Sequence, residues 1–371
     1  ALAAARQQLP PDARPTPTTT LVLRERSAAN PRTTWLRRRG EYLQPVEAIA
    51  PGVLETIAPM PAGVPRNRLG LARWIVSPAN PLTARVAVNR AWQAFFGHGL
   101  VRSLGDFGYQ GDPPTHPELL DWLAAEFQRR GWSHKRLHRL IATSATYRQS
   151  AVVAAAPRAR DPENRWLARG ARVRLEAEMV RDSVLHSSGL LSLRMGGPGV
   201  RPPQPAGVTE VGFGKPTWQA SDGEDRYRRS LYTFHKRTTP FALLQTFDAP
   251  SGEACVVRRE ASTTPLQALT LLNDVLVVDA SRALGALLAG ARGGDQERLQ
   301  LAFVRCLSRP ADDDEATTLL AFVAAQRARL LAGELDAAAI AGPGDGDRRE
   351  VAVWALLARV LFNLDEFVFR R

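Results

Sequence analysis

From Asn67 onward, apolar residues recur every three or four positions, the spacing that gathers them on one face of an α-helix. The segment after Asn80-Pro81 shows this clearly, because asparagine is a good N-cap and proline suits the first helical turn. Gly97 stands where a helix C-cap glycine is expected. Gly131 is expected to end the next helix, and Ser133 to cap the helix after that. The expected core positions are Val88, Ala91, Trp92, Phe95, Leu119, Leu120, Leu123, Phe127, Leu137, Leu140 and Ile141.

Two segments have the form of a capping box, in which the side chains of a Ser or Thr and of a Glu or Gln three residues later each accept a backbone amide. Thr115 with Glu118 is the first, and Thr264 with Gln267 is the second. The second box begins the segment LQALTLLNDVLVV, which is apolar nearly all round. Such a helix is predicted to be deeply buried.

The remaining segments complete the prediction. Helices are expected over residues 174–190, 298–307, 314–332 and 349–367, with a short one starting at 161–163 and a flexible segment at 342–347. Residues 18–53 carry β-branched and aromatic residues at strand-like spacing, and residues 195–225 are rich in glycine and proline. The pattern therefore predicts a mainly α fold: a multi-helix globular domain with long ordered loops and a short β or extended N-terminal arm.

This pattern also predicts the domain organisation. Residues 1–62 are expected to be a linker and extended segment at the junction with an upstream domain, and residues 63–371 the helical domain. Within that domain, lobes 63–195 and 225–371 would be joined by the loop 196–224.

Composition narrows the function classes. Lys135, Lys215 and Lys236 are the only lysines among 49 basic residues, and the net charge is +12. The arginines are spread along the chain and no nucleic-acid-binding motif is present, so a solvated basic surface is favoured and no nucleic-acid partner is expected. No apolar run is long enough to span a membrane. Cys255 and Cys306 form neither a metal-binding pair nor a haem-attachment motif, which leaves one disulfide or two free thiols open.

The first group of candidate residues lies on one loop and the start of the following helix. It comprises His98, Asp106, Asp112, His116 and Glu118. Imidazole and carboxylate groups at this density can bind a metal or perform acid–base catalysis. The chain has no HExxH motif and no calcium-loop spacing, so the favoured alternative is structural, with the aspartates closing turns and no metal site expected. His98, Asp106 and His116 remain the catalytic candidates.

The second group is rich in arginine. Its members are Arg228, Arg229, Arg237, Arg258, Arg259, Asp248, Glu253, Glu260, Tyr227, Tyr232, Phe234 and Phe247. A structural network that also includes Asp106, Asp112, Asn273 and Asp274 is favoured, because buried polar groups need partners. The functional alternative is an anion or sugar-acid site built from Arg229, Tyr232, Arg237, Arg258 and Arg259. Asp106 or Asp112 is predicted to form an ion pair with Arg229, Arg237, Arg258 or Arg259.

Two long blocks carry a resemblance to a known family. Residues 89–127 read NRAWQAFFGHGLVRSLGDFGYQGDPPTHPELLDWLAAEF, and residues 228–274 read RRSLYTFHKRTTPFALLQTFDAPSGEACVVRREASTTPLQALTLLND. They resemble the planctomycete cytochrome-associated domain of unknown function 1553, over about residues 65 to 371. The resemblance implies an exported multidomain bacterial protein with a c-type cytochrome-like domain upstream. Haem would belong to that domain, and no cofactor is expected in residues 1–371.

Two functions follow as hypotheses. The first is an accessory or interaction domain that contacts the upstream domains of its own chain and a glycan or anionic ligand. The second is a hydrolase that acts on acidic or sulfated polysaccharide, in polysaccharide utilisation, through His98, Asp106 or His116 near the arginines. The chain has no GxSxG elbow and no dinucleotide fingerprint, so the sequence leaves open whether the protein is an enzyme.

Overall fold

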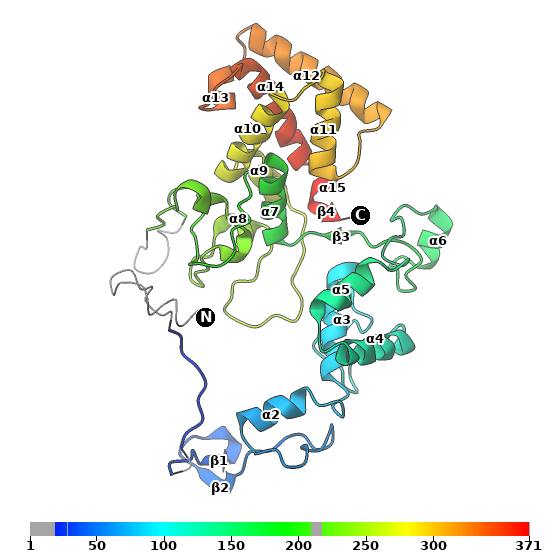
Figure 1. Ribbon diagram of the computed structural model, residues 1–371, viewed down its shortest axis with the longest axis vertical. Coiled ribbons are helices and arrows are strands. Elements are labelled where there is room, and N and C mark those ends of the chain that lie inside the picture. The colour runs from blue at the N-terminus through cyan, green and yellow to red at the C-terminus, as the bar shows by residue number, and fades with distance from the viewer. Residues whose placement is uncertain (1–18, 28, 209–216, 371) are drawn as a thin grey trace, which may run out of the picture. The chain divides into compact units, whose positions relative to one another are not determined.

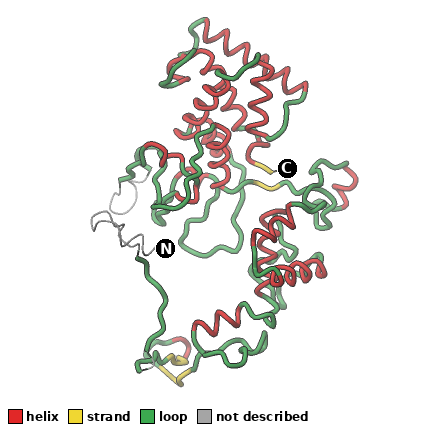
Figure 2. Tube along the Cα trace, viewed as in Figure 1, coloured by secondary structure: helices red, strands yellow, loops and turns green. Residues whose placement is uncertain are grey.

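The computed structural model describes residues 19–27, 29–208 and 217–370. Fourteen α-helices and two two-stranded sheets make up the regular structure of these residues, so the mainly α prediction is confirmed (Figures 1 and 2). The chain divides into two compact units, Ala1–Arg85 and Val86–Arg371. Residues 1–18 and 28 of the predicted linker and extended segment, and residues 209–216 of the loop 196–224, lie outside the described residues.

The first unit carries a small hairpin in the segment for which the sequence predicts a short β or extended arm. Strands β1 (Thr34–Arg37) and β2 (Pro45–Ile49) pair antiparallel, with the short 3-10 helix η2 (Arg38–Gly40) after β1. Nearly every residue of both strands is exposed. Helix α2 (Arg68–Ile75) begins at Asn67, whose side chain accepts the Gly70 amide.

The second unit contains two hydrophobic cores. The smaller core lies among α3 (Thr83–Phe96), α4 (Pro117–Arg129) and α5 (His134–Ala142), and it uses the predicted stripes, including Val88, Trp92 and Phe127. Among the predicted core positions, Phe95 and Leu119 only pack against this core and Leu140 is exposed.

The larger core is built on two adjacent helices, α10 (Val275–Ala289) and α14 (Arg348–Phe362), which lie side by side (Figure 1). They approach closely because Gly285 of α10 has no side chain: a Cβ there would lie 2.7 Å from the Ala355 nitrogen and 2.7 Å from the Val351 oxygen. The elements around this pair are α7 (Ala177–Ser188), α8 (Ala242–Thr246), α9 (Pro265–Asn273), α11 (Asp295–Leu307), α12 (Asp313–Leu331), α13 (Ala337–Ala341) and α15 (Asp365–Val368).

Short elements complete the second unit. Strand β3 (Val173–Arg174) pairs antiparallel with β4 (Phe369–Arg370), so residues nearly 200 positions apart in the sequence lie together. Helix α6 (Ala155–Arg160) precedes β3. The 3-10 helices η3 (Gly223–Tyr227) and η4 (Ser230–Tyr232) follow the long loop. No helix among the described residues is long and apolar enough to cross a membrane.

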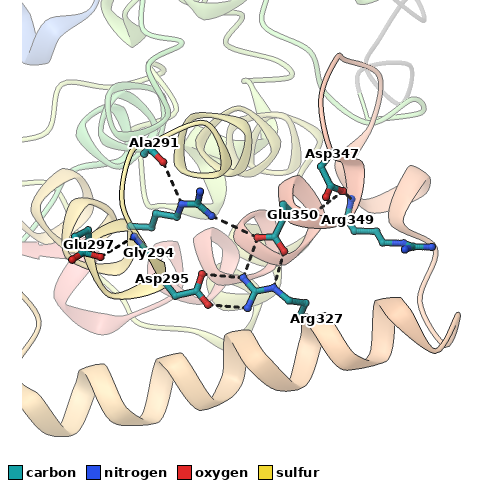
Figure 3. A network of polar contacts seen from close by, with 9 residues as sticks. Ala291, Gly294, Asp295, Glu297, Arg327, Asp347, Arg349 and Glu350 are labelled. Carbon is teal, nitrogen blue, oxygen red and sulfur yellow. Dashed lines mark hydrogen bonds and ion pairs between the residues drawn. The ribbon is translucent and has the colours of Figure 1, made fainter.

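An ion-pair network fixes α11, α12 and α14 to one another (Figure 3). The Arg327 guanidinium on α12 lies between the Asp295 carboxylate at the start of α11 and the Glu350 carboxylate on α14. Arg298 adds a second cation 3.7 Å from Glu350. A charged group is thus shared by three helices at the edge of the larger core.

Several local predictions fail for reasons of tertiary contact. Thr115 is not an N-cap: its amide donates to the Leu100 carbonyl at 2.9 Å, and α4 starts at Pro117 after His116. Asp161 ends α6 instead of starting a helix, because its carboxylate accepts the Arg165 and Trp166 amides.

The predicted buried helix after Thr264 is in fact two helices. The Thr264–Gln267 capping box is confirmed, but the chain breaks at Asp274, which caps α10 by accepting the Leu276 amide. The outer face of α9 is exposed, with Leu266 at 60% and Leu269 at 54% of full exposure. Deep burial is therefore correct for much of α10 and wrong for α9.

Candidate functional site

His98 lies at the start of a loop that a buried asparagine holds in place. Gly97 ends α3 with a φ of +80°, a conformation that favours glycine. The fully buried Asn89 side chain then clamps the loop three residues beyond the histidine: its Nδ2 donates to the Val101 carbonyl at 2.8 Å, and its Oδ1 accepts the Val101 amide at 2.9 Å. Gly99 is required under this clamp, since a Cβ there would lie 2.5 Å from Asn89 Nδ2. The backbone on both sides of His98 is thereby fixed.

The other candidates on this loop have local partners. Asp106 Oδ1 accepts the Gly108 amide at 2.7 Å, which closes a turn. The Asp112 amide donates to Ser103 Oγ at 2.8 Å. His116 precedes α4, and its Nδ1 lies 3.0 Å from Thr115 Oγ1. These contacts account for the loop as a folded element.

The predicted ion pairs between this loop and the second arginine block are wrong. Among the described residues, neither Asp106 nor Asp112 lies within 4.0 Å of an arginine nitrogen in an ion pair, although all four predicted partners are described. The two blocks do come close elsewhere, where a Cβ on Gly105 would lie 3.2 Å from a Val257 methyl group. The approach of the two blocks at this point is apolar, whereas an ion pair was expected between them.

Two arginines of the second block pair with acids on α7 or at its N-cap. Arg259 Nη1 lies 2.6 Å from Glu178 and 3.3 Å from the N-cap residue Glu176, and Arg229 Nε lies 3.7 Å from Asp182. Arg237 and Arg258 are exposed and form no side-chain hydrogen bond or ion pair with any described residue. The predicted group is therefore divided: some members fix the fold and others remain available to a ligand.

The polar residues of the predicted network also have local roles. Asp248 accepts the amide of Ser262 at 2.8 Å and a hydrogen bond from Gln267 at 3.2 Å. Burial raises the pKa of Asp274, which caps α10. Asn273 was predicted to need a buried partner. Its side chain is instead exposed and donates to the Leu269 carbonyl within α9. Glu260 is exposed.

Two fully buried arginines hold the start of the long loop and the segment that follows it. Arg181 of α7 donates to the Arg226 and Arg228 carbonyls and to Ser230 Oγ at 2.9 to 3.1 Å, and burial lowers its pKa to about 10. Arg228 donates to the Pro198, Arg194 and Gly196 carbonyls. Its guanidinium lies 3.8 Å from the Tyr232 ring centroid, and the Tyr232 hydroxyl accepts the Gly196 amide. The candidate Tyr232 is thus part of a structural support.

Two cavities adjoin at His98. The first has a volume of about 660 Å³ and the second about 720 Å³, and both are lined by His98 and Arg172. Neither Asp106 nor His116 lines either cavity. Of the three catalytic candidates, only His98 therefore faces these spaces.

Arginine dominates the charge of both linings. In the first cavity, Glu163 and Asp365 face Arg102, Arg158, Arg165, Arg169 and Arg172. In the second cavity, Glu176, Asp248 and Glu260 face Arg90, Arg172, Arg174, Arg258, Arg259 and Arg370. Each cavity therefore has more basic than acidic side chains, and an anion entering either one meets a favourable potential.

Part of this positive charge is already neutralised by the fold. Arg102 pairs with Glu163 at 2.6 Å, and Arg172 pairs with Asp365. Four others are exposed and make no side-chain hydrogen bond or ion pair with a described residue: Arg158 and Arg165 in the first cavity, Arg90 and Arg258 in the second. Each cavity thus contains two arginines whose donors are available.

His98 responds to the same positive field. Burial lowers the pKa of this imidazole, and the charges of Arg102 and Arg258 lower it further, whereas Glu163 opposes them. The neutral imidazole is therefore favoured while the cavities hold no anion. A negative charge placed beside it would reverse this preference.

Most of the cavity arginines were missed at the sequence level, although a signal was present. Between Arg158 and Arg174 an arginine occurs every two to five residues, which exceeds the density of the second block. That segment contains the short helix α6, the turn closed by Asp161, and the two-residue strand β3. These elements are too short to be recognised from the hydropathy pattern, so the segment was not identified as a candidate site. No group of three or more His, Cys, Asp or Glu side chains suited to a metal occurs in the part of the chain that the structure describes.

Comparison with known proteins gives one match. Residues 67–323, more than two thirds of the chain, match a family described as protein of unknown function (DUF1553). Neither the curated proteins nor the solved structures provide a match. The matched range includes both sequence blocks, His98 and all of the first cavity except Asp365.

Proposed function

Since this chain belongs to the DUF1553 family, whose description assigns no activity, its function has to be inferred from its surface, and we propose that it is an anion-binding accessory domain. One observation carries the proposal: two adjoining cavities have an excess of arginine, and part of that arginine has no internal partner. Other arginines, such as Arg259 and Arg327, are already engaged by carboxylates of the fold, whereas these exposed side chains keep their donors available to a ligand.

The chemistry of the linings favours carboxylate or sulfate groups carried by a sugar. Arginine presents a planar fork of donors that matches an oxyanion with two parallel hydrogen bonds. The linings also offer neutral hydrogen-bonding groups, namely Gln93, Thr115, Asn164 and Thr263, which suit sugar hydroxyls.

Binding is better supported than hydrolysis. A glycoside hydrolase of the usual kind needs two carboxyl groups on either side of the scissile bond. The alternative mechanism through His98, Asp106 and His116 would need these side chains in one cavity, and only His98 lines one. Glu163 and Asp365, the acids of the first cavity, are both held in ion pairs with arginine. A binding role requires none of these groups to react.

The biological setting of the proposal comes from the resemblance given above. In an exported multidomain protein, an anion-binding domain would hold a charged glycan near the upstream domains of the same chain. Any haem chemistry would then occur in the upstream cytochrome-like domain.

The test is titration calorimetry of the whole chain with a sulfated disaccharide and with the same disaccharide lacking sulfate. We expect binding of the sulfated form alone. Arg165→Gln and Arg258→Gln should each weaken binding in their own cavity about tenfold, which corresponds to one lost charge-assisted hydrogen bond of about 1.4 kcal/mol.

Arg292→Gln is the matched control, because it removes the same charge from an exposed position that lines neither cavity. Its affinity should equal that of the unmodified chain. Equal weakening by all three substitutions would mean that net charge alone attracts the sugar. Absence of binding would refute the proposed function.

A further inference from the structure

Two side chains form the boundary between the two cavities, one a permanent cation and the other an imidazole that can be protonated. His98 and Arg172 line both spaces. A ligand that fills one cavity therefore reaches groups that also belong to the other. The two spaces therefore adjoin within the second unit, and each contains arginines with available donors.

Both boundary groups are held in position before any ligand arrives. The Asn89 clamp fixes the loop of His98. Arg172 pairs with Asp365, and its guanidinium lies 4.3 Å from the centroid of the Phe369 ring. Because the backbone at His98 and the side chain of Arg172 are already held, a ligand that passes between the cavities loses less affinity to ordering them.

The available arginines lie in both cavities. Arg158 and Arg165 belong to the first, and Arg90 and Arg258 belong to the second. A small anion can satisfy one group only. A molecule with negative charges at intervals along its length can engage both groups at once, and the second contact then forms within the complex at a high effective concentration.

We propose that the two cavities form one elongated site that binds a linear acidic oligosaccharide, whose chain passes His98 and Arg172. This inference rests on the proposed function and adds to it that the ligand is a chain with repeated charges. The sugar chain occupies both spaces simultaneously, and one protein molecule binds one such chain.

The linings distinguish an acidic sugar chain from single-stranded nucleic acid. Nucleic-acid-binding grooves present open aromatic faces on which bases stack. Here Trp92, Phe96 and Phe247 in the linings are at most 6% exposed, and the guanidinium of Arg172 lies 4.3 Å from the ring centroid of the half-buried Phe369, so the protein itself covers these rings. Amide and hydroxyl side chains are available instead, as a sugar backbone requires.

The experiment is a calorimetric length series from a sulfated disaccharide to a sulfated decasaccharide, using the whole chain. We expect the short ligand to bind with a stoichiometry of two per chain and the long ligand with one. Affinity should increase by about 100-fold or more once the ligand spans both cavities, and then become constant with further length.

Two variants connect this change to the structure. With the disaccharide, Arg165→Gln and Arg258→Gln should each weaken one of the two binding events and leave the other unchanged. With the decasaccharide, each should weaken the single event, and Arg292→Gln should weaken neither.

The outcomes separate the two proposals. If the disaccharide binds but length brings neither higher affinity nor the change in stoichiometry, the elongated site is refuted and the anion-binding function stands. If no sulfated sugar binds, both are refuted. Tighter binding of oligothymidylate or of polyglutamate than of the decasaccharide, at equal charge and salt, would assign the site to a nucleic acid or to an acidic protein and overturn the sugar-chain inference.

Discussion

Replacing Arg327 by methionine tests the ion-pair network shown in Figure 3. The guanidinium makes four hydrogen bonds to two carboxylates: 2.6 and 3.0 Å to Glu350, and 2.8 and 3.0 Å to Asp295. Methionine keeps much of the apolar stem and removes every donor. The substitution therefore separates the charge contribution from the packing of the side chain.

The expected cost lies between two limits. Fully exposed ion pairs contribute about 0 to 1 kcal/mol, whereas breaking a buried pair from one side costs about 3 to 5 kcal/mol. The Arg327 side chain is 28% exposed, so solvent screens part of the interaction. Glu350 keeps Arg298 at 3.7 Å, and Asp295 keeps its favourable place in the first turn of α11. We expect a loss of about 2 kcal/mol in the free energy of unfolding.

Arg329→Met is the control. Arg329 is on the same helix and pairs with Glu334 at 3.2 Å, but the two side chains are 48% and 59% exposed. Its substitution should cost less than about 0.5 kcal/mol. Urea denaturation followed by circular dichroism measures both values, and hydrogen exchange locates the loss in α11, α12 and α14. Equal urea midpoints for the two variants would refute the claim that the shared guanidinium stabilises this bundle.

Two further substitutions test the helix contact and the site. Gly285→Ala should lower the free energy of unfolding by about 1 to 3 kcal/mol, because the new Cβ meets the α14 backbone at 2.7 Å. The control Gly290→Ala, whose nearest contact is 3.4 Å, should be close to neutral. Equal melting temperatures for the two variants would contradict the predicted clash at Gly285. Burial and the charges of Arg102 and Arg258 lower the pKa of His98, and Glu163 opposes them. A bound anion raises this pKa, so the affinity for sulfated sugar should increase as the pH falls from about 8 to about 5.5. His98→Gln should remove this dependence in calorimetry, and a persistent slope would assign it to another group.

The helices were predictable from sequence wherever their determinants are local. Ser133 caps α5, and Thr264 with Gln267 forms a full capping box, because the residues that make these contacts are three positions apart. Thr115 fits the same pattern and fails, since a carbonyl 15 residues away takes its amide. Asp274 ends a helix that hydropathy alone would continue, because its carboxylate caps the next one.

The candidate site was only partly predictable, because its members come together through distant pairing. His98 was identified from its loop, but most of the arginines that line the two cavities come from other segments: α3, residues 158–174, the loop after α8, and β4. Strand β3 brings its segment beside β4, and Arg370 of β4 donates to the Ala94 and Phe95 carbonyls at the end of α3. Nothing in the hydropathy pattern indicates a contact between such short strands at this separation.

The pairing of β3 with β4 also sets an order of events during synthesis. The smaller core uses only residues up to Ala171, so it can form as soon as that segment has left the ribosome. The second cavity cannot, because Phe369 and Arg370 belong to its lining, and Arg172 on the boundary of the first cavity gains its partner Asp365 only at the same stage. A nascent chain would thus acquire the proposed elongated site only when residue 370 pairs with Val173.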